Sequence, residues 1–124
     1  MVGDNGEVKT MAGIDFARIA DARRKAEEVS GLHFSVWVGE TDADARDHAE
    51  RLHAGLPDPE RSVYLVCDTG QRTLEIVTGS GARQTLTDEE CVLATVTMKD
   101  IARTGDLSEA LVLGLDHLGT YALD

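Results

Sequence analysis

The sequence predicts a single-domain α/β/α sandwich with a small mixed sheet, in the element order α-β-α-β-β-α-α. Three observations predict this class. Apolar residues recur every three or four positions in four segments, alternate with polar residues over 32–38, and run without interruption over 63–67. The length of 124 residues, 42% of them hydrophobic, is sufficient for one domain with its own core.

Residues 1–13 contain three glycines and little periodicity. We therefore expect a flexible lead-in with a candidate short edge strand around Val8, followed by one domain over 14–124. From Asp15 the apolar spacing predicts an amphipathic helix, which Gly31 ends as a left-handed cap. The alternation over 32–38 then predicts a strand.

A second helix is predicted to begin near Thr41 or Asp42, whose side chains can accept free amides of the first turn, and to end before Pro57. The apolar run over 63–67 is typical of a central strand covered on both faces. A turn at 68–71 and a return strand over 73–78 predict an antiparallel hairpin. The connection through the second helix is long enough for a parallel crossover, so the sheet is expected to be mixed.

The last two helices carry start signals. Thr87 and Glu90 have the spacing of a capping box, and the third helix is expected to bury Cys91, Ala94, Met98 and Ile101. Asp106 is the predicted cap of a fourth helix, in which Gly114 allows close approach of a neighbouring element. We expect a monomer rather than an oligomer, because the leucine stripe of this last helix suits ordinary core; self-association along the stripe is the alternative.

Twelve Lys plus Arg against 23 Asp plus Glu give a formal net charge of -11, spread along the chain. This charge repels phosphate backbones and anionic lipid, so we expect no nucleic-acid binding and no membrane insertion. An unknown protein partner with a basic patch, or a bound cation, suits the charge better. A solvated acidic surface is the alternative.

Cys67 and Cys91 lie in apolar contexts without zinc-site spacing. Both are predicted to be buried free thiols, with a disulfide as the alternative. The first residues lack a secretory pattern, and no apolar run reaches the length of a membrane span. We therefore expect a cytoplasmic location.

Strand directions place the candidate site at one end of the sheet. The end of the third strand at Gly79 is expected beside the start of the second strand at Ser62, whereas the turn at Asp68 lies about 20 Å away. The candidate ligand-binding residues at the Gly79 end are Asp58, Glu60, Gly79, Ser80, Gly81, Asp88 and Glu89.

Carboxylates of this set, Glu60 and Asp88 foremost, are candidate ligands for calcium or another divalent cation, because hard cations need several oxygen ligands. The alternative is that Asp88 and Glu89 favour the helix dipole and that the glycines allow a tight turn. No nucleophile with an adjacent base stands out, so no catalytic residue is assigned.

Five short segments in this order resemble the TPM domain family, and the resemblance covers about residue 14 to the end. They are 31–39 (GLHFSVWVG), 56–59 (LPDP), 71–79 (QRTLEIVTG), 86–88 (LTD) and 105–107 (GDL). The chain is most similar to a short branch of that family in high-GC Gram-positive bacteria, whose function is unassigned. The resemblance implies a small sheet between helices, in agreement with the pattern above.

The family also implies alternatives for function. Many TPM domains have Asp-Asp-Gly or Asp-Asn-Gly before the second strand, where this chain has Glu60, Arg61 and Ser62, so only Glu60 keeps a carboxylate. We expect a non-enzymatic interaction or regulatory module with an acidic surface and a candidate ion site. The alternative is a weak, metal-assisted hydrolase, because a chloroplast relative is associated with acid phosphatase activity and calcium binding.

Overall fold

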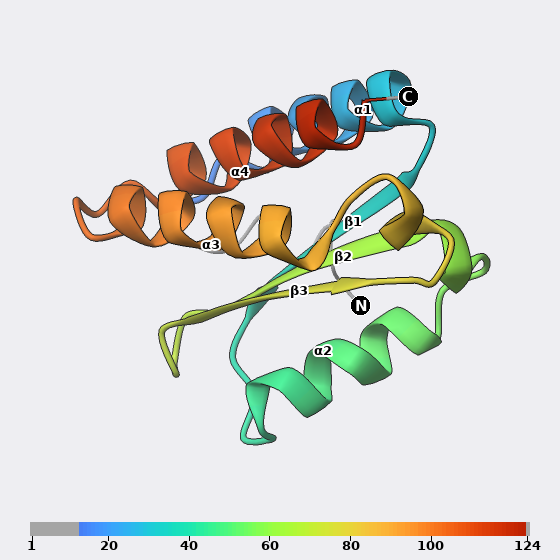
Figure 1. The fold of residues 1–124 in the computed structure, drawn as a ribbon. Helices are drawn as coiled ribbons and strands as arrows, with labels where there is room; N and C mark the ends of the chain where they lie inside the picture. Colours follow the sequence, from blue (N-terminus) through green and yellow to red (C-terminus); the bar gives the residue numbers. More distant parts are fainter. Residues whose placement is uncertain (1–12, 124) are drawn as a thin grey trace.

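The structure, a computed structural model, describes residues 13–123 and confirms the predicted sandwich. Figure 1 shows α1, α3 and α4 on one face of the sheet and α2 on the other. The predicted edge strand near Val8, and all but the last residue of the predicted lead-in, lie outside the described residues. The elements are α1 (Phe16–Ser30), β1 (His33–Gly39), α2 (Ala45–Ala54), η2 (Pro59–Arg61), β2 (Ser62–Asp68), β3 (Thr73–Thr78), η3 (Ala82–Gln84), α3 (Asp88–Ala102) and α4 (Leu107–Tyr121), where η marks short 3-10 helices.

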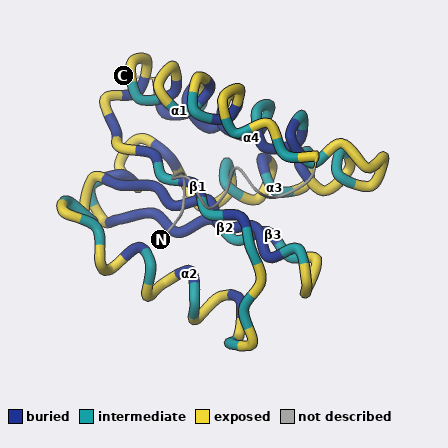
Figure 2. The backbone as a smooth tube through the Cα atoms, turned by 180° about the vertical axis from the view of Figure 1, so that it is seen from behind, coloured by how far each residue is buried: buried dark blue, intermediate teal, exposed yellow. Residues whose placement is uncertain are grey.

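The sheet has the order β1-β2-β3, with β1 parallel to β2 and β3 antiparallel to it. Every residue of β2 is buried, and Figure 2 shows this burial through the centre of the molecule. A central strand covered on both faces is therefore confirmed. The amide of Gly79 donates to the carbonyl of Ser62 at 3.0 Å, so these residues share one end of the sheet, while Asp68 lies at the other.

In the layer of three helices, α4 packs against both α1 and α3. Two glycines of α4 allow this close approach of the helices. A Cβ added at Gly114 would lie 2.2 Å from Sδ of Met98 in α3, and one at Gly119 would lie 2.9 Å from Cα of Ala26 in α1. The close approach predicted for Gly114 is confirmed. The larger hydrophobic core lies between this layer and the sheet.

The other face of the sheet carries a smaller core beneath α2 alone. Its buried members are Ala49, Tyr64, Val66 and Val77, and the partly buried side chains of Trp37, Leu52 and Leu56 pack against them. The sheet is thus covered unequally, by three helices on one face and by one ten-residue helix on the other.

The helix caps largely match the predictions. The predicted capping box of α3 forms in both directions, with Thr87 Oγ1 accepting from the Glu90 amide and the Glu90 carboxylate accepting from the Thr87 amide. The start of α2 was predicted wrongly near Thr41 or Asp42, since the helix begins at Ala45 with Asp44 as its cap.

The reason for the later start of α2 is a long-range contact. The Thr41 amide donates to Oδ2 of Asp68, and the Thr41 hydroxyl accepts from the Ala43 amide. These two bonds hold the segment as a turn before α2, and local sequence signals do not show the first of them.

Both cysteines are free, as predicted, but only Cys67 is buried; Cys91 is half-buried on α3, as is Ile101. Ala94 and Met98 are the buried residues of that helix. Within residues 13–123, none of the helices has the length and apolar character needed to cross a bilayer.

Candidate functional site

The glycines of the predicted site serve close packing at the Gly79 end of the sheet. A Cβ added at Gly79 would lie 1.9 Å from the Pro59 carbonyl oxygen, and one at Gly81 would lie 3.0 Å from the Glu60 carbonyl oxygen. Ser80 between them is exposed. The structure therefore brings the glycine segment beside η2, as predicted, through backbone contact that leaves no room for a side chain at Gly79.

The carboxylates beside η2 face solvent. Asp58 has a side chain that is 48% exposed and lies 3.5 Å from Nε2 of His33, a pair that is ionic only when the histidine is protonated. Glu60 is exposed. The guanidinium of Arg61 donates to the Gly31 carbonyl at 3.0 Å, so it ties η2 to the end of α1.

Asp88 and Glu89 lie exposed on the first turn of α3, where carboxylates interact favourably with the helix dipole. No group of three or more His, Cys, Asp or Glu side chains within residues 13–123 is placed to hold a metal ion. Calcium takes about six to eight oxygen ligands. The donor set built on Glu60 and Asp88 therefore does not fit a calcium site in the part of the chain that is described.

A pocket of about 380 Å³ opens at the opposite end of the sheet, where β2 passes into β3. Its apolar residues are buried or half-buried, whereas its three basic residues are exposed. The lining comes from the end of β2 and its turn (Cys67, Asp68, Thr69, Arg72), the start of β3 (Thr73, Leu74), the end of α3 (Lys99, Ala102, Arg103) and the start of α4 (Leu107).

Asp68 forms the structural centre of this end. Its side chain is buried, at 1% exposure, and accepts from the amides of Thr41 and Gln71 and from the Gln71 side-chain amide. Gln71 Nε2 also donates to the carbonyls of Thr41 and Ala43. Since its oxygens are engaged by three N–H groups, Asp68 ties the β1–α2 loop to the hairpin turn rather than presenting a free carboxylate to the pocket.

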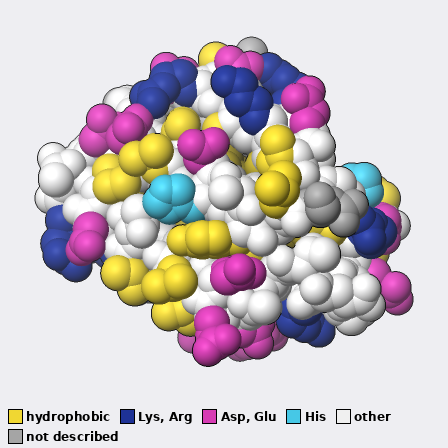
Figure 3. Space-filling model, turned by 45° about the horizontal axis from the view of Figure 1, so that its top comes forward, with side chains coloured by type: hydrophobic (Ala, Val, Ile, Leu, Met, Phe, Trp, Pro, Cys, Tyr) yellow, Lys and Arg dark blue, Asp and Glu magenta, His cyan; other side chains and the backbone are white. Residues whose placement is uncertain are grey.

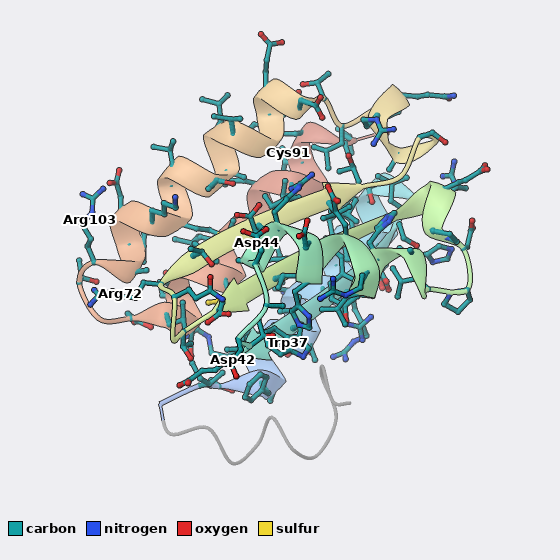
Figure 4. All side chains as sticks on the ribbon, turned by 90° about the horizontal axis from the view of Figure 1, so that it is seen from below. Trp37, Asp42, Asp44, Arg72, Cys91 and Arg103 are labelled. Atoms are coloured by element: carbon teal, nitrogen blue, oxygen red, sulfur yellow. The ribbon has the colours of Figure 1, made fainter. Side chains whose placement is uncertain are left out.

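Arg72 is the one non-glycine residue of the described chain with a positive φ, 58°. An L-residue in this left-handed conformation costs about 1 kcal/mol or more. Figure 4 shows Arg72 in the hairpin turn close to Arg103 at the end of α3. The strained turn thus places the guanidinium of Arg72 in the lining of the pocket.

The three basic side chains differ in their partners. Arg103 forms an exposed ion pair of 2.9 Å with Asp100, one turn earlier on α3. The ion pairs of the described residues involve neither Arg72 nor Lys99. At least two cations on the pocket are therefore available to an anionic ligand.

The one thiol in the pocket is not a nucleophile at neutral pH. Burial, with a smaller contribution from the negative charge of Asp68, raises the pKa of the Cys67 thiol from 9.0 to about 12. Only the thiolate attacks or binds metal. Histidine is absent from the described lining residues, so no imidazole base stands beside this thiol.

Sequence reasoning missed this pocket because it treated Asp68 as a turn residue and did not group Arg72 with Lys99 and Arg103. Two signals point to it. Ligands tend to bind beyond the carboxyl ends of parallel strands, and β1 and β2 both end here. The second signal is that Arg72 lies in the hairpin turn at this end, and that Lys99 and Arg103 lie near the end of the predicted third helix.

Two solved structures share the fold. The NMR structure of the BA42 protein from the psychrophilic bacterium Bizionia argentinensis superposes with a TM-score of 0.78 at 19% identity, over 93% of this chain and 85% of that one. The N-terminal domain of a protein from P. gingivalis gives 0.72 at 20% identity, over 89% and 76%. The model of a domain of unknown function, DUF5130, matches residues 2–118, so the chain belongs to the DUF5130 family.

Proposed function

We propose that this domain is a non-enzymatic binding module whose ligand is a small amphipathic anion, held in the pocket between the hairpin turn and the end of α3. One observation carries the proposal: Arg72, Lys99 and Arg103 converge on a largely apolar pocket in a protein of net charge -11.

The charge of the ligand follows from Arg72 and Lys99, which form no ion pair with another described residue. Arg72 offers a planar guanidinium, which matches the two oxygens of a carboxylate or phosphate, and Lys99 offers a compact ammonium. Hydrogen bonds between ionised partners are stronger than those between neutral ones. Among the described lining residues the one carboxylate is that of Asp68, which already accepts from three N–H groups.

The apolar part of the ligand follows from the rest of the lining. Leu74, Ala102 and Leu107 contribute hydrocarbon surface to the pocket. Exposed ion pairs contribute only about 0 to 1 kcal/mol each, so charge alone binds weakly at an open site. Burial of a short hydrocarbon chain adds about 0.8 kcal/mol per CH₂.

Binding without chemistry fits the groups present. The Cys67 thiol is protonated at neutral pH because burial raises its pKa to about 12. A metal-assisted hydrolase, the alternative drawn from the chloroplast relative, needs a donor set that residues 13–123 do not assemble. We therefore favour the binding module.

We extend the proposal to two expectations from the sequence, the relation to the TPM family and the location in the cell. The five TPM-like segments and the shared fold of the two solved structures support a place within the wider TPM group. A cytoplasmic location is part of the proposal as well. Fractionation of cells that express the tagged protein tests the location, and recovery in the membrane or secreted fraction would contradict it.

The binding experiment uses hexanoate and hexyl phosphate as probes, followed through backbone amide shifts in NMR spectra of the full chain. Hexanol carries the same hydrocarbon chain without charge, and inorganic phosphate carries charge without the chain. We expect saturable shifts at Thr73, Leu74 and Ala102 with the two amphipathic anions, and weaker binding of hexanol and phosphate.

Arg72→Gln is the decisive variant, and Arg51→Gln on α2 is its matched control on the other layer of the sandwich. Loss of one exposed charge-assisted contact is expected to raise the Kd of hexanoate about twofold to fivefold in the first variant and to leave it unchanged in the second. Equal binding of hexanol and hexanoate, or equal effects of the two variants, would contradict the proposal.

A further inference from the structure

The outward face of α3 carries a group of exposed hydrophobic side chains. Five large hydrophobic residues are exposed in the described part of the chain. Three of them lie on α3 within five consecutive positions: Val92 is 61% exposed, Leu93 55% and Val96 54%. Scattered single apolar residues are normal on a surface, but a contiguous group on one helix face is typical of an interaction site.

Two members of this group, Val92 and Val96, lie within a ridge along α3. It is here called the α3 ridge and consists of Glu89, Val92, Val96, Lys99 and Arg103. The spacings of three and four residues place these side chains on one face of the helix, opposite the buried Ala94 and Met98. Leu93 flanks the ridge. Figure 3 shows hydrophobic side chains exposed among charged ones on the side of the molecule that carries the three helices.

Two of the three charges of the ridge, Glu89 and Lys99, lie symmetrically about its apolar centre, whereas Arg103 has no charged counterpart at the equivalent position, Thr85. Glu89 lies five residues before Ala94 and Lys99 lies five residues after it, while Val92 and Val96 lie two residues on either side. A twofold axis crossing the helix at the level of Ala94 therefore places Val92 of one copy against Val96 of the other. It also places each Glu89 against the Lys99 of the second copy.

We infer that the α3 ridge is the interface of an antiparallel homodimer. A twofold interface must be complementary to itself, and the ridge meets this condition in its apolar centre and in the pairing of Glu89 with Lys99. A parallel arrangement of two such helices would oppose acid to acid and base to base. The ridge thus selects one orientation of a second copy of this chain.

The expected dimer is weak. The ridge from Glu89 to Lys99 spans about 15 Å of helix, which buries less than the roughly 800 Å² per partner of a standard interface. The net charge of -11 on each copy opposes association. At physiological salt, however, charges more than about 8 Å apart are largely screened, so most of that repulsion is removed. We expect a Kd on the order of 10 to 100 µM.

Sedimentation velocity of the full chain over a concentration series tests the inference. The wild-type protein is expected to pass from monomer to dimer in this range. Val96→Asp places a charge at the centre of the interface and is expected to raise the Kd at least about tenfold, whereas Leu123→Asp, at a residue 63% exposed outside α3, leaves it unchanged. Circular dichroism establishes that both variants are folded.

A charge exchange gives the sharper test. Glu89→Lys alone and Lys99→Glu alone each oppose like charges twice per dimer and are expected to raise the Kd about fivefold. The double variant restores both pairs and is expected to return to within about threefold of wild type. A clean monomer at all concentrations, a dimer insensitive to Val96→Asp, or a double variant no better than the singles would overturn the inference.

This test is separate from that of the proposed pocket. Lys99 belongs to both features, but Arg72 lies in the hairpin turn outside α3. Arg72→Gln is expected to weaken hexanoate binding and to leave the dimer Kd unchanged, so either proposal can fail alone. A dimer that Arg72→Gln disrupts as strongly as Val96→Asp would place the interface at the pocket and contradict the α3 ridge.

Discussion

Gly79→Ala tests whether the predicted site glycine serves packing rather than ligand binding. A Cβ at this position would lie 1.9 Å from the Pro59 carbonyl oxygen and 2.5 Å from the Glu60 carbonyl oxygen. Real Cβ contacts are essentially never closer than 3.0 Å, so η2 must move away from the end of β3 by about 1 Å. Because both of the crowding atoms belong to the backbone, no side-chain rotation relieves the clash.

The energetic cost follows from what that movement disturbs. Overpacking of a well-packed region costs about 1 to 3 kcal/mol. The displacement also strains the bond from the Gly79 amide to the Ser62 carbonyl, which is 3.0 Å long, and a hydrogen bond of this kind contributes about 1 kcal/mol. Alanine recovers about 0.4 to 1 kcal/mol by restricting the unfolded chain. We expect a net loss of about 1 to 3.5 kcal/mol in the free energy of unfolding.

Gly55→Ala is the matched control. Gly55 has φ -84° and ψ 0°, which alanine adopts freely, and its added Cβ would meet its nearest atoms at 3.7 Å. Urea denaturation followed by circular dichroism is expected to show no loss of stability for this variant but a gain of about 0.4 to 1 kcal/mol, because alanine restricts the unfolded chain. A Gly79→Ala protein as stable as wild type, or a Gly55→Ala protein equally damaged, would refute the packing argument.

Two further predictions concern the pocket. Arg72→Gly relieves the strain of the positive φ, about 1 to 2 kcal/mol, but it also makes the unfolded chain more flexible, which offsets about 0.4 to 1 kcal/mol. We expect a net gain of about 0 to 1.5 kcal/mol in the free energy of unfolding, together with weaker hexanoate binding; urea denaturation and NMR titration of the same sample measure both, and a loss of stability would contradict a strained turn. The folded pKa of the Cys67 thiol, about 12, lies above its unfolded value of 9.0, so as pH rises above 9.0 the unfolded chain releases a proton that the folded chain retains. The contribution of this thiol to stability is thus fully present below pH 9.0 and is lost at up to about 1.4 kcal/mol per pH unit above it. Cys67→Ala should make the fall of the unfolding free energy above pH 9.0 less steep, while the Cys91 thiol, whose pKa is raised to about 11, still contributes to it; an unchanged slope would contradict the raised pKa of Cys67.

Local signals accounted for most of the fold. The return strand over 73–78 and the capping box at Thr87 were found where the sequence placed them, because alternation, turn residues and caps are encoded within a few positions. The start of α2 was missed because it depends on a bond between Thr41 and Asp68, 27 residues apart. Strand polarity correctly placed Gly79 beside Ser62, but it did not show how tightly Pro59 closes that end.

The pocket could not be read from the sequence because its lining comes from four separate segments. Arg72 precedes β3, and Leu107 is the first residue of α4. Lys99 lies in the last turn of α3, and Arg103 directly follows that helix. None of them forms a motif with its neighbours along the chain. The sequence did predict that β1 and β2 are parallel and therefore end at the same edge of the sheet. Because ligands tend to bind beyond the carboxyl ends of parallel strands, this prediction alone would have pointed to the Asp68 end as well as to the Gly79 end.

The two ends of the sheet therefore have different physical characters. At the Gly79 end, backbone contacts with η2 fill the space, and Arg61 is tied to Gly31. At the Asp68 end, the hairpin turn stands away from α3 and leaves a pocket bordered by cations. The rest of the surface is acidic, so an approaching anion is repelled at long range and attracted only within a few ångströms of the pocket. Apolar contact must then supply much of the affinity, which favours an amphipathic ligand over a simple inorganic ion.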